Sequence, residues 1–192
     1  MQIRETANDT LENLDYDIRN FSDPSEMRDL IYARNKTNNK ARMVAGYCWK
    51  WISKKIPLMD DIVFPEFKFS AKWNLSDDGM LWIVKPESVM EVGCIHTCQG
   101  LEVDYIGVII GPDLIVRNGI VITDPSKRAS ADSSVRGYKK LLKESSNQRE
   151  VAEMLDRVIK NTYRTLMTRG QKGCYIYSVD TETQDYFSNL LN

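Results

Sequence analysis

Residues 92–110 read VGCIHTCQGLEVDYIGVII, and this stretch decides the fold class. It contains two apolar runs of strand length, 92–95 and 105–110, without the polar alternation of a strand that has one face in water. Strands of this kind are covered on both faces, as in a parallel sheet flanked by helices. We therefore predict an α/β domain with a mostly parallel central sheet. Other short apolar runs predict further strands at 41–47, 81–84 and 173–179.

Helices are predicted on both sides of these strands. Asp23, followed by Pro24, offers an N-cap and a proline at the first helical position, so a helix should run to about Asn38. Apolar residues recur at helical spacing over 151–167, and Gly170 would close that helix in a left-handed cap. The remaining helices are expected at 48–55 and 181–191.

Four segments surround this framework in a single domain of 192 residues. Residues 1–22 form a polar lead, and 57–80 carry scattered aromatic residues that predict an irregular insertion with short strands. Asn-Gly at 118–119 joins two apolar runs and predicts a β-hairpin, because both turn positions need positive φ. Residues 127–148 are polar and rich in Ser and Lys, which is typical of a mobile surface loop.

Composition describes an ordinary globular protein, with 42% apolar and 28% charged residues and a net charge of −1. This charge gives no general attraction to nucleic acid, so any such binding needs a local patch. The four cysteines are widely spread among apolar residues, which favours reduced thiols and a cytoplasmic location. With no apolar run of about 18 residues and no leader pattern, we expect neither membrane insertion nor secretion.

The chain's only histidine, His96, opens a cluster directly after the predicted strand at 92–95. In α/β sheets, ligands bind at the carboxyl ends of strands. Gly100 would let backbone N–H groups approach a phosphate, and Glu102 would accept a hydrogen bond from a ribose hydroxyl. A histidine with a structural partner and a solvated glutamate explain the same residues equally well.

A second cluster, 165–173, ends the long helix. Arg169 there is placed to stabilise negative charge on a transferring phosphoryl group, as an arginine finger does. The alternative is that the cation only complements the dipole of the helix C-terminus.

Aromatic and basic residues alternate just after the strand at 41–47. Tyr47 and Trp49 would offer stacking faces to single-stranded nucleic acid, and Lys50 a phosphate contact. An amphipathic helix with its aromatic face in the core accounts for the pattern as well.

Together these clusters resemble the conserved motifs of superfamily 1 helicases. His96 through Gly100-Leu101-Glu102 is similar to motif V, and Thr168-Arg169-Gly170 is similar to the Thr-Arg-Ala core of motif VI. More closely, residues 46–51, 91–100 and 161–173 resemble the Schlafen group 3-like helicase family. Two departures are Arg164 where motif VI has tyrosine, and Gly170 where it has alanine.

The resemblance implies that residues 1–192 form one second RecA-like (P-loop NTPase-like) helicase lobe. Arg169 would be the finger on ATP, and other residues would contact the nucleotide: Gly100, Glu102, Gln99 and Arg42. Nucleic-acid contacts or coupling would fall to His96, Thr97, Tyr47, Trp49, Lys50 and Thr168. The chain contains no Gly-x-x-x-x-Gly-Lys-Ser/Thr loop. ATP with Mg²⁺ would therefore be shared with a missing N-terminal lobe, in the same or another chain, and single-stranded DNA or RNA would be the second partner.

Three other interpretations remain open at this point. Cys94-x-His96-x-Cys98 gathers three soft ligands, as a zinc site does, although a fourth ligand and a Cys-x-x-Cys turn are missing. Asp61 followed by Glu66-Phe67-Lys68 has the spacing of some metal-dependent nucleases. A non-catalytic module that binds nucleic acid or protein on a helicase-like scaffold is the third.

Overall fold

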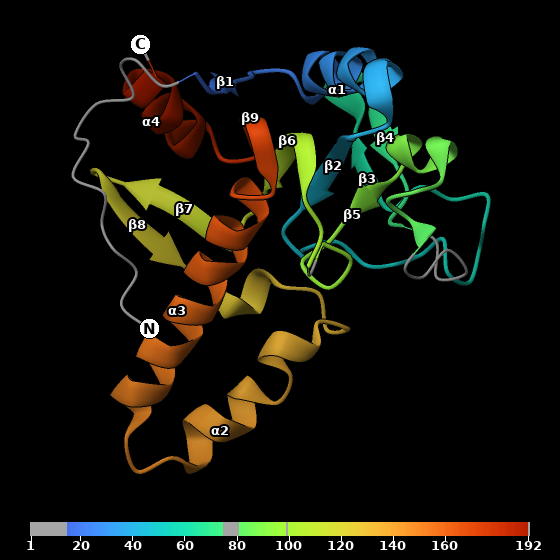
Figure 1. The fold of residues 1–192 in the computed structure, drawn as a ribbon. Coiled ribbons are helices and arrows are strands. Elements are labelled where there is room, and N and C mark those ends of the chain that lie inside the picture. Colours follow the sequence, from blue (N-terminus) through green and yellow to red (C-terminus); the bar gives the residue numbers. More distant parts are fainter. Residues whose placement is uncertain (1–14, 75–80, 99, 192) are drawn as a thin grey trace.

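A five-stranded, all-parallel sheet forms the centre of the molecule, in the order β1-β9-β6-β2-β5 (Figure 1). The computed structural model describes residues 15–74, 81–98 and 100–191. The strands are β1 (Asp17–Asn20), β2 (Ala41–Ala45), β5 (Val92–Gly93), β6 (Val103–Ile110) and β9 (Gly170–Ser178). The predicted α/β class with a parallel central sheet is confirmed.

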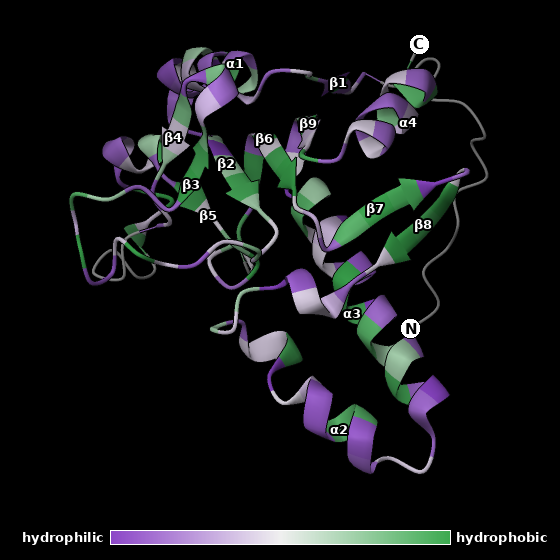
Figure 2. Cartoon of the chain, turned by 180° about the vertical axis from the view of Figure 1, so that it is seen from behind, coloured by the Kyte–Doolittle hydropathy of each residue, from purple (hydrophilic) through white to green (hydrophobic). Residues whose placement is uncertain are grey.

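Both faces of the sheet are buried, because successive side chains of each strand point to opposite sides. On β2, Met43 and Ala45 join one apolar cluster, whereas Val44 joins the other. Helix α1 (Pro24–Asn38) covers the first face with Met27 and Ile31. Helix α3 (Gln148–Met167) covers the second. In Figure 2 the central strands are accordingly green, whereas the helices around them are largely purple.

The helix boundaries follow the predicted capping residues in α1. The Asp23 carboxylate accepts a hydrogen bond from the Ser25 N–H at 2.7 Å, and the helix ends at Asn39 with φ of 57°. In α3 the prediction of the end was wrong. The cap is Thr168, and Gly170 starts β9, where a Cβ would lie 2.1 Å from the Gly173 carbonyl oxygen. A close backbone approach, not a left-handed cap, requires glycine there.

Two small antiparallel hairpins and two further helices complete the domain. The predicted hairpin at 118–119 is confirmed as β7 (Leu114–Arg117) and β8 (Ile120–Thr123), with φ of 52° and 75° at Asn118 and Gly119. The insertion contains β3 (Ile62–Phe64) and β4 (Phe69–Ala71). The C-terminal helix is α4 (Thr181–Leu191). Across the described residues, each helix is too short or too polar to span a bilayer.

Three local predictions were wrong. Residues 48–55 form turns instead of a helix, because the Asp61 carboxylate accepts from the backbone N–H groups of Ile52 and Ser53. Residues 81–84 also form turns, in which the buried Trp82 packs over Gly93. The lead segment holds β1, which pairs with β9 at the edge of the sheet.

The segment 127–148 is the largest difference from the predicted loop. It contains the 3₁₀ turn Ser133–Val135 and helix α2 (Tyr138–Glu144), which packs against α3 (Figure 1). The side chains of Arg128 and Asp132 are fully buried, because each finds an oppositely charged partner inside the protein. Polar composition in this segment therefore reflects an internal ion-pair network as well as solvent exposure.

Candidate functional site

The candidate residues lie at two opposite edges of the sheet. Strands β6 and β9 begin together, since Val103 is paired with Gly170, so Leu101 and Arg169 lie at the amino-terminal edge. Strands β2 and β5 end together, since Val44 is paired with Gly93, so Tyr47 and His96 follow the carboxyl-terminal edge. Gly100 and Glu102, which the sequence placed in one cluster with His96, therefore lie beside Arg169 at the opposite edge of the sheet from His96.

At the amino-terminal edge, Arg169 is held against the Gly-Leu-Glu turn. Its Nε donates to the Thr165 carbonyl oxygen at 3.1 Å, and its Nη1 to the Leu101 carbonyl oxygen at 3.3 Å. The Arg169 carbonyl oxygen in turn accepts from the Val103 N–H at 3.0 Å. The arginine is half-buried and has no carboxylate partner among the described residues. Its guanidinium thus faces only neutral acceptors, at long hydrogen-bond distances.

The turn beside Arg169 is open to solvent. Gly100 has φ of 78°, and a Cβ added there would meet no atom within 4 Å. Glu102 is exposed, as is Thr168, whose hydroxyl donates to the Arg164 carbonyl oxygen at 2.9 Å. Gln99 lies outside the described residues. The amino-terminal edge therefore presents a half-buried cation, an exposed carboxylate and the open backbone of Gly100 close together in sequence and in the fold.

Arg42 is not part of this surface. Its side chain is fully buried, and all three of its nitrogens donate to protein acceptors. The acceptors include Asn35 Oδ1 at 2.7 Å and the carbonyl oxygen of Ile83 at 2.8 Å. Burial lowers the pKa of Arg42 to about 10, although Glu91 opposes this effect. In this arrangement Arg42 ties α1 and the turn at 81–85 to β2 and presents no donor to a nucleotide.

At the carboxyl-terminal edge, His96 is half-exposed and contacts a buried carboxylate. Its Nε2 lies 3.4 Å from Asp132 Oδ1, and its ring meets Tyr47 edge to face at 6.2 Å. Tyr47 is itself buried and stacks on Trp73 at 5.3 Å, so its ring face is occupied. Thr97 donates to Asn74 Oδ1 at 2.6 Å. Of these residues, His96 is the one that solvent reaches most freely.

Beyond Tyr47, the aromatic and basic residues form an irregular loop. Trp49 is half-buried against Phe64, and its carbonyl oxygen accepts from Trp73 Nε1 at 3.3 Å. Lys50 is exposed, and Lys54 places its ammonium 5.2 Å from the centre of the Trp51 ring. The amphipathic-helix interpretation of this run was wrong, and the loop presents lysines at the protein surface.

A buried polar network behind His96 was missed by sequence reasoning. Arg128 donates from Nε to Asp113 Oδ2 at 2.8 Å and from Nη1 to Asp132 Oδ2 at 2.5 Å. Tyr163 of α3 donates to the other Asp113 oxygen and accepts from the Gly111 N–H at 2.9 Å. Burial alone would lower the pKa of Arg128, but the two carboxylates outweigh it and raise that pKa.

Only the i,i+4 spacing of Arg128 and Asp132 hinted at this network in the sequence. It connects His96, through Asp132, Arg128 and Asp113, to Tyr163 near the carboxyl-terminal end of α3, the helix that ends beside Arg169. The segment 94–102 makes a second connection between the edges. It leaves the sheet next to His96 and returns to the opposite edge at Leu101.

The metal and nuclease interpretations do not fit these positions. Cys94 and Cys98 are buried in different apolar clusters, whereas His96 points to Asp132, so the three ligands do not converge. Asp61 accepts four hydrogen bonds from Ile52, Ser53 and Trp73 and anchors the surrounding loops. An aspartate engaged in this way is a structural residue.

An all-parallel sheet covered on both faces is consistent with a RecA-like α/β fold, and at one edge of this sheet an arginine at a helix end lies beside a Gly-Leu-Glu turn. Residues 1–180 match the family described as Schlafen group 3, DNA/RNA helicase domain, and the chain belongs to that family.

One curated relative is an uncharacterized protein of Saccharomyces cerevisiae, 24% identical over 182 residues. The match covers 93% of this chain but only 37% of that relative's length. No solved structure matches the chain.

Proposed function

We propose that the chain is the C-terminal motor lobe of an ATP-dependent nucleic-acid helicase or translocase. ATP with Mg²⁺ would bind at the amino-terminal edge, between this lobe and a second lobe that supplies the phosphate-binding loop. The observation that carries the proposal is the contact between Arg169 and the turn formed by Gly100, Leu101 and Glu102. Family membership supports the same assignment.

The chemistry at this edge suits a nucleotide. Arg169 has no carboxylate partner within the described residues, and a γ-phosphate is a stronger acceptor than the two carbonyl oxygens it now contacts. The open space beside Gly100 lets a backbone N–H approach a phosphate, and the exposed Glu102 suits a ribose hydroxyl. Arg42 has no part in this proposal, because its donors are already engaged.

The nucleic acid would lie at the carboxyl-terminal edge. His96 is accessible there, and the adjoining loop carries the exposed lysines Lys50, Lys54 and Lys55. Because the net charge of the chain is only −1, such a local cluster of cations is what attraction to phosphates requires. Closure of the nucleotide cleft on ATP would shift the segment 94–102 and change the grip on a single strand.

The test is ATP hydrolysis by this chain and by a longer polypeptide that includes the neighbouring lobe, each with and without single-stranded DNA or RNA. We expect turnover only in the longer polypeptide, stimulated by nucleic acid. Arg169→Ala should reduce it by about 10³-fold or more. The matched control is Arg157→Ala, an exposed arginine on the same helix α3, which should leave turnover within about twofold.

The role of Glu102 gives an independent readout. Glu102→Gln should raise the KM for ATP more than the KM for 2′-deoxy-ATP, because only ATP offers the 2′-hydroxyl to the carboxylate. A longer polypeptide that hydrolyses no ATP, or that tolerates Arg169→Ala, would leave a non-catalytic binding module as the better description.

A further inference from the structure

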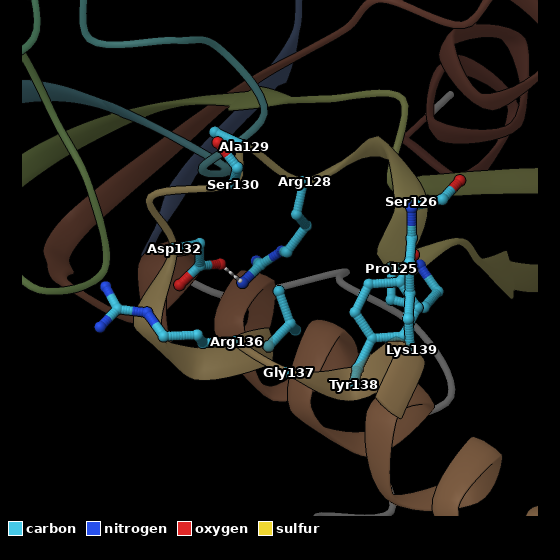
Figure 3. Close-up of a pocket in the computed structure, with 11 residues that line it drawn as sticks. Pro125, Ser126, Arg128, Ala129, Ser130, Asp132, Arg136, Gly137, Tyr138 and Lys139 are labelled. Carbon is cyan, nitrogen blue, oxygen red and sulfur yellow. Dashed lines mark hydrogen bonds and ion pairs between the residues drawn. The ribbon is translucent and has the colours of Figure 1, made fainter. Parts of the chain in front are cut away.

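A cavity of about 360 Å³ lies between the 3₁₀ turn Pro125–Lys127 and the start of α2 (Figure 3). Its volume falls within the range of small-ligand sites, about 300–1,000 Å³. It adjoins the carboxyl-terminal edge of the sheet, because the Ala129 N–H donates to the Tyr47 carbonyl oxygen at 2.8 Å and Asp132 contacts His96. The cavity is thus next to the surface assigned above to a single strand.

Arg128, which lines this cavity, has one unused donor. Its Nε and Nη1 are bound to Asp113 and Asp132, and Figure 3 shows the contact with Asp132. Its Nη2 is buried, because the whole side chain is 0% exposed, and this atom has no hydrogen-bond partner among the described residues. Buried guanidinium nitrogens are normally satisfied, so this atom calls for an acceptor.

The charges around the cavity favour an anionic acceptor. Arg136 and Lys139 line it as well, and neither pairs with a carboxylate within the described part of the chain. In Figure 3, Arg136 points outward on the far side of Asp132, and Lys139 occupies the opposite wall. Asp132 is the one lining carboxylate, and its oxygens already accept from Arg128 and from the N–H and hydroxyl of Ser134.

The other lining groups suit a nucleotide better than a small free ion. Ser126 and Ser130 are exposed and provide hydroxyl donors, and Pro125, Val135 and Tyr138 form apolar walls. Two rim cations without a carboxylate partner among the described residues, the unused Nη2 of Arg128, two hydroxyls and an aromatic ring match a phosphate group together with its attached sugar. Volume, charge and position therefore agree on one kind of ligand.

We propose that this cavity binds a phosphate group of single-stranded nucleic acid, with Arg128 Nη2 as the buried donor and Lys139 and Arg136 as the cations at its rim. The inference rests on the proposed function, because it adds a specific phosphate contact to the nucleic-acid surface. Two phosphates share this chemistry, a 5′-terminal monoester and an internal diester of the strand.

The test uses the 192-residue chain and a 3′-labelled oligonucleotide, with either a 5′-phosphate or a 5′-hydroxyl, in a fluorescence anisotropy titration at several salt concentrations. Lys139→Gln removes one rim cation. Its control is Lys143→Gln, an exposed lysine one turn further along α2 that does not line the cavity. We expect Lys139→Gln, but not Lys143→Gln, to weaken binding several-fold and to reduce the slope of log K against log salt by about 0.7.

The two phosphate sources separate in the same titration. If Lys139→Gln weakens binding of only the 5′-phosphorylated strand, the bound group is the terminal monoester. If it weakens binding of both strands equally, the bound group is an internal diester. In parallel, inorganic phosphate should shift the ¹H–¹⁵N resonances of Ser130 and Gly137 at the cavity.

The cavity assignment would be overturned if Lys139→Gln and Lys143→Gln both bind the strand as the wild type does, with the same slope of log K against log salt, and if phosphate leaves the Ser130 and Gly137 resonances unmoved. That result would leave the proposed function intact. If the wild-type chain binds neither strand, the nucleic-acid part of both proposals is overturned. The loss of ATP hydrolysis in Arg169→Ala is measured independently of this titration, so the two failures are distinguishable.

Discussion

Replacing Arg128 with methionine should destabilise the fold far more than an ordinary surface substitution. Methionine keeps the apolar stem but leaves two carboxylates without their cation, in a place where all three side chains are 0% exposed. Asp113 would retain mainly the Tyr163 hydroxyl and the Cys48 thiol, and Asp132 mainly the two donors of Ser134. Removing one partner from a buried ion pair costs about 3–5 kcal/mol. If the free energy of unfolding falls by about 2 kcal/mol per molar urea, this loss lowers the midpoint of urea unfolding by about 2 M.

The control is Arg117→Met, which removes a pair of similar length but different burial. Arg117 and Asp180 are 2.6 Å apart, with side chains 38% and 19% exposed, so the loss should stay within about 1 kcal/mol. Equal losses in the two variants, measured by urea unfolding at pH 7, would refute the argument that burial makes the Arg128 network costly to break.

The loss of stability in Arg128→Met should also depend on pH. Burial opposes ionisation of Asp132, but hydrogen bonds from Ser134 and the charge of Arg128 lower its pKa below the ordinary value. A carboxylate whose pKa is lowered in the folded state stabilises the fold above its unfolded pKa, about 3.9, and loses that contribution as the pH falls through the folded pKa. The difference in free energy of unfolding between wild type and Arg128→Met should therefore be largest at pH 7 and should become smaller below about pH 4. A difference that does not depend on pH would contradict this mechanism.

Three smaller predictions test other parts of the fold. Gly46→Ala should lower the free energy of unfolding by about 1–3 kcal/mol or more, because a Cβ would lie 1.9 Å from the Tyr163 phenolic oxygen. An unchanged urea midpoint would show that Tyr163 moves aside without loss. Gly119→Ala should cost only about 1–2 kcal/mol, since its φ of 75° is strained for alanine but the surrounding space is empty. Burial raises the pKa of the Cys98 thiol, so at pH 8 mass spectrometry should find it alkylated only after unfolding, and rapid labelling of the native chain would place it at the surface.

Much of the architecture follows from local pattern. The apolar run that ends at Ile110 predicted a strand covered on both faces. Helix α3 shows its apolar period throughout because its C-terminal half packs on the sheet and its N-terminal half packs against the segment that contains α2. Residues 48–55 were mispredicted for a physical reason. Their helical spacing is real, but Asp61, which lies outside this run, accepts hydrogen bonds from the N–H groups of Ile52 and Ser53 and holds them in a turn. A single-residue side-chain contact overrode local periodicity there.

The sequence named candidate site residues, but it could not give their arrangement. His96 and Glu102 are six positions apart, which suggests one site, yet the segment between them must run back along the sheet before parallel strand β6 can begin. Apart from the i,i+4 spacing of Arg128 and Asp132, nothing in the sequence indicated the network around Arg128, because Asp113 and Tyr163 join it from separate elements that only the folded chain brings together.

This arrangement explains how a nucleotide at one edge would be sensed at the other. For Arg169 to reach a phosphate on a neighbouring lobe, it must release the Leu101 carbonyl oxygen, which is the end of the segment that starts beside His96. Both present acceptors of Arg169 are neutral and at least 3.1 Å away, so the exchange for a phosphate is favourable and the release is easy. Residues 94–102 would then be free to move at their Leu101 end while Cys98 stays anchored in the core. If Leu101 moves when a nucleotide binds, we expect the described residues on the two sides of Cys98 to pivot about that buried side chain, which would couple Leu101 to His96.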